Sequence, residues 1–156
     1  MRLLIIRHGE SEADLLDVHE GRADFLLTER GHKQAKAMAE YIARCYKVEK
    51  IYCSTLCRAK QTAQHISEKT GISFTPDEKL MEFNNGLIAG LERKVVEEKF
   101  PVVPNLPLHD SVYEQESKLY FRFRADYMLS KITSENVSDA TVAVVTHGGM
   151  INQLYR

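Results

Sequence analysis

Residues 2–9, RLLIIRHG, begin with a short apolar run and stop abruptly at three residues of a different kind. The apolar, partly β-branched run at residues 3–6 is typical of a buried β-strand. Arg7, His8 and Gly9 follow at the carboxyl end of this predicted strand. Ligands bind at the carboxyl ends of the strands in open α/β sheets, so this junction is the first candidate for a functional site.

The segments after this run alternate between helical and extended patterns. Apolar residues recur at helical spacing over 29–45 and predict an amphipathic helix. Residues 50–53 and 72–75 are predicted to be short strands, and a second amphipathic helix lies between them. We expect Ser54 to cap this helix and Gly71 to end it. The order βαβαβ predicts a parallel sheet covered by helices.

The remaining segments are less regular. Residues 10–27 and 76–90 are predicted to form loops, because neither shows a clear period. Residues 91–99 predict a short charged helix, and residues 112–133 predict a long one. No internal repeat, low-complexity stretch or domain boundary is visible, so we expect residues 1–156 to form a single domain.

The bulk composition excludes several classes of protein. The chain has 156 residues and a formal net charge of −1 at pH 7, so no strong field is available to hold nucleic acid or an anionic membrane. The apolar run at residues 3–6 is far too short for a signal peptide or a membrane span. We therefore expect a cytoplasmic protein with reduced thiols, and neither nucleic acid nor a membrane as its partner.

The three cysteines, Cys45, Cys53 and Cys57, raise the question of a metal site. Cys53 and Cys57 have a spacing with which such a site can begin, but no second Cys or His pair stands at ligand spacing. Small packing side chains are the favoured interpretation of these thiols, and we predict no metal.

A second predicted strand ends in the same way as the first. The run at residues 141–145, TVAVV, has the most strand-like pattern in the chain and leads into THGG, in which His147 precedes two glycines. Packing does not readily explain this repetition, whereas glycine lets the backbone pass close to a ligand. Arg58 follows the strand at 50–53, in the first turn of the next helix. Three strand ends would then direct two histidines and two arginines to one place.

Such a cluster suits a phosphate group. Arg7 and Arg58 offer planar forks of donors that match phosphate oxygens, and they offset charge that develops on them. They also tend to lower the pKa of a nearby histidine and keep one ring nitrogen unprotonated. A neutral imidazole can attack phosphorus if its other nitrogen donates to a backbone carbonyl. The leaving oxygen then needs a proton, which a carboxyl group can supply.

The residues around these histidines resemble the histidine phosphatase superfamily, which includes the cofactor-dependent phosphoglycerate mutases. The matching stretches are RHGES at 7–11, LTERG at 27–31 with QA at 34–35, IYCSTLCRA at 51–59 with QTA at 61–63, Leu80 with Glu82 and Gly86, and VVTHGG at 144–149. They stand in the family's order and cover nearly the whole chain. The expected fold is a three-layer α/β/α sandwich with a mainly parallel central sheet.

The resemblance also implies roles for individual residues. His8 resembles the phosphorylated nucleophile, and Glu82 resembles the group that protonates the leaving oxygen and later activates water. Arg7, Arg58 and His147 resemble the phosphate pocket. Ser11 is a possible substrate contact. No metal or other cofactor is implied, because the arginines supply the positive charge.

The chain departs from the family pattern in several places. Asp14 stands where the family often has asparagine, so this carboxylate either points away from the phosphate or meets a cationic group of the substrate. Residues 87–90 replace the aromatic and acidic residues usual before a middle glycine. Glu116 and Arg124 echo a family pattern in the long helix, and we place them outside the phosphate pocket. The chain is also short after its last histidine motif, as a truncated or compact member would be.

Three functions stay open from the sequence. The leading hypothesis is a phosphatase that hydrolyses a small phosphomonoester through a phosphohistidine at His8. A phosphoglycerate mutase would form the same intermediate, but the chain is short, lacks tryptophan and has no room for the long insertion of those enzymes. A non-catalytic module that binds a phosphorylated ligand is the third. A missing edge strand would favour pairing between chains, so a homodimer is possible.

Overall fold

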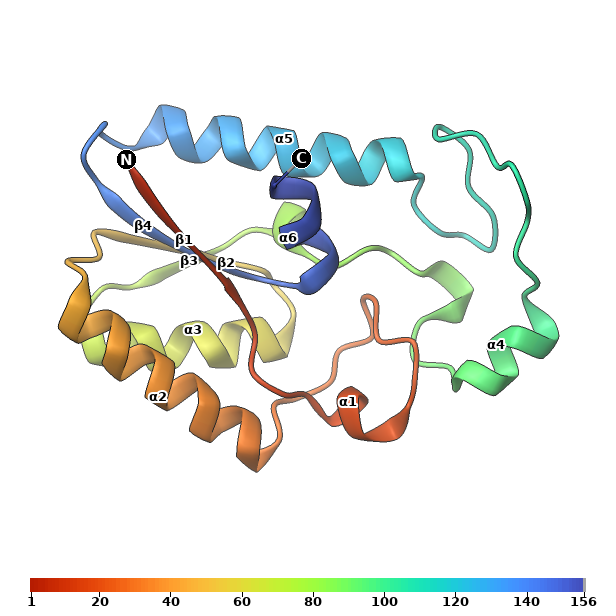
Figure 1. Ribbon diagram of the computed structural model, residues 1–156, viewed down its shortest axis with the longest axis horizontal. Helices are drawn as coiled ribbons and strands as arrows, with labels where there is room; N and C mark the ends of the chain where they lie inside the picture. Colours follow the sequence, from red (N-terminus) through yellow and green to blue (C-terminus); the bar gives the residue numbers. More distant parts are fainter. Residues whose placement is uncertain (156) are drawn as a thin grey trace.

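Strand β1 (Arg2–Arg7) lies at one edge of a four-stranded sheet in the computed structural model, which describes residues 1–155 (Figure 1). The strand order is β1-β4-β2-β3, in which β4 is Thr141–Thr146, β2 is Lys50–Cys53 and β3 is Phe74–Pro76. Each neighbouring pair of these strands runs in parallel. The prediction of a mainly parallel sheet is therefore confirmed.

The register of the sheet brings three strand ends to the same edge. Arg7 of β1 pairs with Thr146 of β4. Cys53 of β2 pairs with Val145, one residue earlier in β4. The residues that come next in the chain are His8, His147 and Ser54. The pairing of the strands thus places both motif histidines side by side, at the carboxyl edge where ligands bind.

Helices cover both faces of the sheet (Figure 1). Helices α2 (Glu29–Cys45) and α3 (Cys57–Thr70) pack against each other on one face, while α5 (Lys118–Glu135) and α6 (Gly148–Leu154) lie toward the other. The central strand β4 serves both layers because successive side chains of a strand point to opposite faces. Its Ala143 and Val145 join the core under α2 and α3, and its Val142 and Val144 join the core under α5. This arrangement is the predicted three-layer sandwich.

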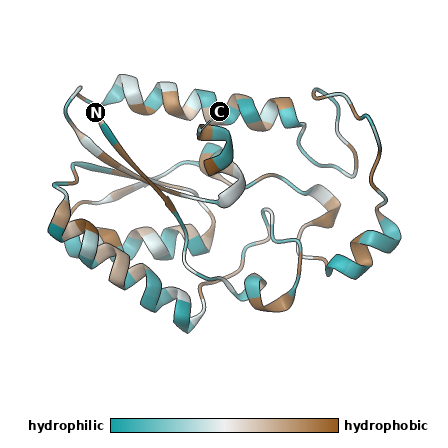
Figure 2. Cartoon of the chain, in the orientation of Figure 1, coloured by the Kyte–Doolittle hydropathy of each residue, from teal (hydrophilic) through white to brown (hydrophobic). Residues whose placement is uncertain are grey.

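The hydropathy pattern agrees with these layers. Figure 2 shows hydrophobic colouring along β1 and a mixture of hydrophobic and hydrophilic residues along α2. All six residues of β4 are buried, as expected for a central parallel strand with helices on both sides. None of the helices in the described part of the chain is long and apolar enough to cross a membrane.

The other elements lie in the connections between strands. They are α1 (Glu12–Leu16), the 3₁₀ helices η1 (Glu78–Leu80) and η2 (Gly86–Ile88), and α4 (Arg93–Lys99). Helix α1 corrects the prediction of a loop over residues 10–27. This short helix is stabilised at its start, where the Asp14 carboxylate accepts a hydrogen bond from the Ser11 backbone amide (2.8 Å).

The predicted start of α3 is wrong by two residues. The helix ends at Gly71 as expected, with a left-handed φ of 75°, but it begins at Cys57 and Ser54 does not cap it. Asp24, from a distant loop, accepts a hydrogen bond from the Cys57 amide instead (2.6 Å). Local sequence could not reveal this cap, because its donor and acceptor are more than thirty residues apart.

Two further boundaries also differ from the prediction. The long helix begins at Lys118 rather than at residue 112, because Tyr113 and Glu114 adopt left-handed φ values of 55° and 59° that a helix cannot continue. The Ser117 side chain caps it by accepting from the Tyr120 amide (3.1 Å). Strand β3 occupies residues 74–76 instead of 72–75.

Candidate active site

His8 lies immediately after β1 and is 6% exposed. Its Nδ1 is 2.7 Å from the Gly9 carbonyl oxygen, so this nitrogen is the one that carries a proton and donates. The other nitrogen, Nε2, accepts a hydrogen bond from Nε of Arg58 (3.3 Å). Burial, reinforced by the charges of Arg58 and Arg7, lowers the pKa of His8 to about 4. At neutral pH the ring is therefore uncharged, with an unprotonated Nε2.

His147 lies immediately after β4 and is fully buried. Its ring centroid is 5.1 Å from that of His8, and its Nε2 is 2.7 Å from the Ser54 hydroxyl oxygen. The Leu56 amide donates to the same hydroxyl oxygen (3.3 Å), which favours donation of the Ser54 proton to Nε2. Nδ1 of His147 has no hydrogen-bond partner within the described part of the chain. Burial lowers the pKa of His147 far below its usual range, so this neutral ring presents Nδ1–H as a free donor.

The two arginines differ in how firmly they are held. Arg58 is fully buried in the first turn of α3, and its two terminal nitrogens donate to the carbonyl oxygens of Ala23 (3.0 Å) and Gly21 (2.8 Å). The side chain of Arg7 is 58% exposed, and its Nη2 lies 3.6 Å from a carboxylate oxygen of Asp14. Arg58 is therefore preorganised at the base of the site, whereas Arg7 stands at its rim.

A pocket of about 310 Å³ opens beside these groups. Its lining residues are Arg7, His8, Gly9, Glu10, Asp14 and Gln34. Asp14 thus faces the pocket, where its carboxylate is engaged by the backbone of Ser11 and lies near Arg7. Ser11 itself is fully buried, and its hydroxyl donates to a carboxylate oxygen of Glu20 (2.5 Å).

Glu82 reaches the same edge of the sheet from the loop after η1. Its carboxylate oxygens accept hydrogen bonds from the backbone amides of Phe83 (2.8 Å) and Gly149 (2.9 Å). Gly149 is the second glycine of the motif that follows His147, and any side chain there would collide with the Glu82 carboxylate. The second motif glycine therefore makes room for Glu82 beside the end of β4.

A buried ion pair holds the loop that carries Glu82. The guanidinium of Arg124 and the carboxylate of Glu116 are nearly inaccessible and lie 2.6 Å apart. Arg124 also donates to the carbonyl oxygens of Lys79 (2.7 Å), Met81 (3.0 Å) and Glu82 (3.2 Å). Both side chains contact the loop rather than the two histidines, so they act on the site by fixing the backbone of Glu82.

The sequence interpretation missed two residues of this site, Glu20 and Ser54. One oxygen of Glu20 lies 3.2 Å from Nε of Arg58, and the other lies 3.9 Å from Nε2 of His8. Burial raises the pKa of Glu20, although the hydrogen bond from Ser11 opposes the shift. Glu20 falls in a stretch without periodicity, and Ser54 was interpreted as a helix cap. No local signal distinguished either residue.

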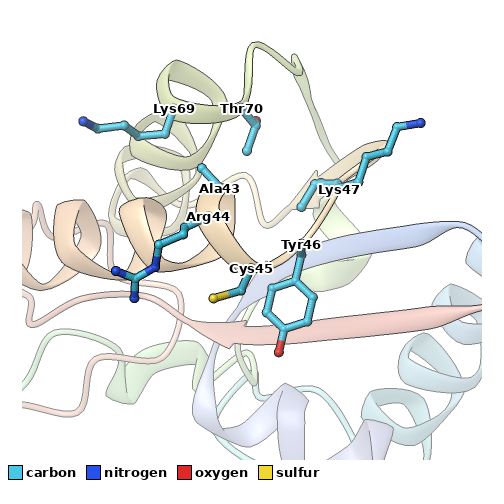
Figure 3. Close-up of a pocket in the computed structure, with 8 residues that line it drawn as sticks. Ala43, Arg44, Cys45, Tyr46, Lys47, Lys69 and Thr70 are labelled. Atoms are coloured by element: carbon cyan, nitrogen blue, oxygen red, sulfur yellow. The ribbon is translucent and has the colours of Figure 1, made fainter.

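A second pocket lies at the other end of the molecule. It has a volume of about 450 Å³. Its lining side chains, drawn in Figure 3, come from the last turn of α2, the residues that follow it and the end of α3. Arg44, Lys47 and Lys69 contribute cations, but no residue predicted for the functional site lines this pocket. The pocket at the carboxyl edge of the sheet is therefore the candidate active site. Within residues 1–155 no three His, Cys, Asp or Glu side chains group closely enough to hold a metal ion.

Comparison with known proteins identifies relatives over most of the chain. Phosphoserine phosphatase 1 of Hydrogenobacter thermophilus is 34% identical over 101 residues, which cover 65% of this chain and 47% of that protein. A 2,3-bisphosphoglycerate-dependent phosphoglycerate mutase of Mesorhizobium japonicum is 29% identical over 168 residues, which cover 97% of this chain and 78% of the mutase. The match to the first of these relatives thus spans about half of its length.

Solved structures cover a larger share of both chains than the match to phosphoserine phosphatase 1 does. A mycobacterial glucosyl-3-phosphoglycerate phosphatase superposes with a TM-score of 0.85 and 26% identity, covering 99% of this chain and 77% of that one. The family that matches residues 3–156 is described as the histidine phosphatase superfamily, branch 1. The resemblance inferred from the sequence motifs is confirmed, and this chain belongs to the histidine phosphatase superfamily.

Proposed function

We propose that the protein is a phosphatase that hydrolyses a small phosphomonoester through a phosphohistidine at His8. One observation carries this proposal. Nδ1 of His8 donates to the Gly9 carbonyl, so the unprotonated Nε2 faces the buried guanidinium of Arg58. A neutral, oriented imidazole beside an anion-binding guanidinium is what attack on phosphorus requires.

Binding of the phosphoryl group uses donors from three strand ends. Arg58 lies within hydrogen-bond reach of His8 Nε2, so a phosphorus atom beside that nitrogen would have its oxygens next to the guanidinium. The unpartnered Nδ1–H of His147 supplies a further donor, and Arg7 approaches from the rim. These groups offset the charge that develops on the phosphoryl oxygens in the transition state.

The reaction then proceeds in two steps. Nε2 of His8 forms a bond to phosphorus as the ester P–O bond breaks, and Glu82, in its protonated form, gives the leaving oxygen a proton. The Gly9 carbonyl stabilises the positive charge that the phosphorylated ring acquires. In the second step the Glu82 carboxylate takes a proton from a water molecule that attacks phosphorus. The N–P bond breaks, and phosphate leaves with His8 restored.

Solvent access supports hydrolysis over transfer to a second hydroxyl. The side chains of Arg7 and Asp14 are 58% and 36% exposed at the mouth of the pocket, so water can reach the intermediate. The absence of tryptophan and of a long insertion in this sequence points the same way. The mutase stays the second candidate because the Mesorhizobium japonicum mutase aligns over 97% of the chain.

A labelling experiment tests the phosphohistidine. The protein is incubated with a small ³²P-labelled phosphomonoester, quenched, and digested to locate the label. We expect an acid-labile, alkali-stable label on His8 in the wild type and in His65→Ala, a control on α3. His8→Ala should carry none. Full activity in His8→Ala would disprove the mechanism.

Two product assays separate the alternatives. Release of inorganic phosphate from a panel of small phosphomonoesters supports the phosphatase, and isomerisation of phosphoglycerate without net phosphate release supports the mutase. Phosphate or vanadate binding without turnover of any ester in the panel supports a non-catalytic module. The same panel identifies the leaving group.

The proposal includes the cellular compartment of the protein, which we infer to be the cytoplasm. All three cysteines are free in the structure, with Cys53 buried and Cys45 exposed, which fits the reducing cytoplasm that we infer.

Strand β1 lies at an edge of the sheet, where it can pair with a second copy of the chain. A homodimer therefore stays a prediction, which sedimentation analysis tests.

A further inference from the structure

Glu20 lies beside His8 and Arg58, although the proposed reaction gives it no role. Its Oε1 lies 3.2 Å from Nε of Arg58. The same oxygen accepts a hydrogen bond from the Ser11 hydroxyl, with 2.5 Å between the two oxygens. Its Oε2 lies 3.9 Å from Nε2 of His8, the nitrogen proposed to attack phosphorus. One carboxylate thus contacts both the nucleophile and the buried guanidinium that a phosphoryl group needs.

The charged, titratable and hydrogen-bonding groups around Glu20 come from four parts of the fold. They are His8 and Arg7 at the end of β1, Ser11 and Asp14 at the start of α1, Arg58 in α3, and His147 behind the ring of His8. Burial keeps both histidines neutral at neutral pH. Without ligand the cations of Arg7 and Arg58 therefore face the carboxylates of Glu20 and Asp14. Glu10 in the pocket lining and Glu82 at the same edge add further carboxylates, so the pocket lacks the net positive charge that attracts a phosphate dianion.

An ionised Glu20 and a bound phosphoryl group compete for the guanidinium of Arg58. Nε of Arg58 donates its single proton to Nε2 of His8 and lies 3.2 Å from the Glu20 carboxylate, so an ionised Glu20 offsets the positive charge that a phosphoryl oxygen would otherwise meet. Two anions that share a buried site also repel each other strongly, and one of them is expected to take up a proton. A protonated Glu20 would turn from a competing acceptor into a donor for a phosphoryl oxygen.

From this geometry we infer that Glu20 is a specificity-determining residue of the phosphate pocket: it pairs with Arg58 in the free protein and takes up one proton when a phosphoryl or similar oxyanion binds. Burial already raises the pKa of Glu20 in the free protein, in the direction that this proton uptake needs. The inference rests on the proposed function insofar as the pocket must bind a phosphoryl group.

The sign of the resulting pH dependence follows from the proton count. Between the pKa of Glu20 in the free protein and its higher pKa in the complex, the bound state holds up to one more proton than the free state. Affinity for a fully ionised anion must therefore fall as pH rises through this range, by up to about tenfold per pH unit. Phosphomonoesters would bind best together with a proton, which favours their monoanion or a mildly acidic medium.

Sulfate is the probe for this test, because it keeps a constant charge while the protein titrates. Its affinity is measured by isothermal titration calorimetry from about pH 5.5 to about pH 8.5, in buffers of different ionisation enthalpy that reveal proton uptake. We expect the wild type to take up about one proton per sulfate and to lose affinity as pH rises. Glu20→Gln keeps the size of the side chain and should bind sulfate without proton uptake, with a flat pH profile.

Two controls make the result specific to Glu20. Glu12→Gln removes the same charge from an exposed position on α1 and should behave like the wild type. Circular dichroism melting curves confirm that each variant is folded. Proton uptake that persists in Glu20→Gln would assign the proton to His8 or His147 and overturn the inference. Equal sulfate affinity in Glu20→Gln and the wild type at high pH would overturn it as well.

Failure of the inference about Glu20 can be distinguished from failure of the proposed function. If the label forms on His8 but sulfate binding is independent of pH, the phosphohistidine mechanism stands and the role of Glu20 is wrong. If sulfate binding shows the Glu20-dependent proton uptake but no label forms, the pocket binds oxyanions without the proposed turnover. If neither the wild type nor Glu20→Gln binds sulfate, the inference is wrong whatever the labelling shows.

Discussion

His8 and His147 end neighbouring parallel strands, and each is followed by glycine, yet the structure prepares them for opposite tasks. In His8 the backbone carbonyl of Gly9 engages Nδ1 and leaves Nε2 as an acceptor. In His147 the hydroxyl of Ser54 engages Nε2, and Nδ1 has no partner among residues 1–155. The role of a buried histidine therefore depends on the group bound to its other nitrogen, because that group decides which nitrogen carries the proton.

The largest expected effect is the loss of the proposed nucleophile. His8→Ala should lower kcat by about 10⁴-fold or more, because no other group can form the covalent intermediate. Steady-state phosphate release measures the loss. If His8→Ala retains more than about one hundredth of the wild-type rate, the two histidines are not divided into nucleophile and donor as we describe.

His147 should matter less, and in a different way. His147→Ala removes a donor to the phosphoryl oxygens and should lower kcat by about 10²- to 10³-fold, while the label on His8 still forms slowly. His147→Asn keeps a donor near the position of Nδ1 and should recover part of this loss. Rapid-quench labelling distinguishes the variants. A His147→Asn variant as slow as His147→Ala would argue against donation from Nδ1.

Both neutral histidines should make the fold sensitive to acid. The folded pKa of His8 is about 4 against an unperturbed value of 6.5, so the unfolded chain binds more protons between these values and stability falls as pH falls through this window. His8 alone accounts for roughly 3 kcal/mol of this loss. Urea unfolding at several pH values measures it. His8→Asn should make the curve less steep while the contribution of His147 remains, and the exposed-site control His109→Asn should leave the slope unchanged.

The smallest expected effect concerns the partner of His147. Ser54→Ala removes the hydroxyl that engages Nε2, so the Nδ1–H tautomer is no longer favoured and kcat should fall by about tenfold. Ser130→Ala, at an exposed position on α5, is the matched control and should leave the rate unchanged. An unchanged rate in Ser54→Ala would mean that Ser54 does not orient His147.

The main elements could be predicted from sequence because their patterns are local. The helix over 29–45 has the predicted bounds, and the strand at 141–145 needed only one more residue. The errors arose where distant residues decide the structure. Asp24 caps α3 from another loop, and the Tyr113 carbonyl, in the left-handed stretch that delays α5, accepts a hydrogen bond from the distant Leu87 amide. Neither contact leaves a periodic signal in the segment that it changes.

The sequence by itself determined the strand-histidine-glycine motifs, Arg7 and Arg58, and with them the family and the parallel sheet. A β-strand pattern has a short period, and parallel strands carry their functional residues at one edge, so these properties follow from local order. Only the tertiary structure decided the partner of each imidazole nitrogen and the meeting of Glu82 with Gly149. It also placed Glu20 between His8 and Arg58. Hydrogen bonds between remote segments leave no periodic pattern in the sequence. In this site they decide which ring nitrogen of each histidine carries a proton.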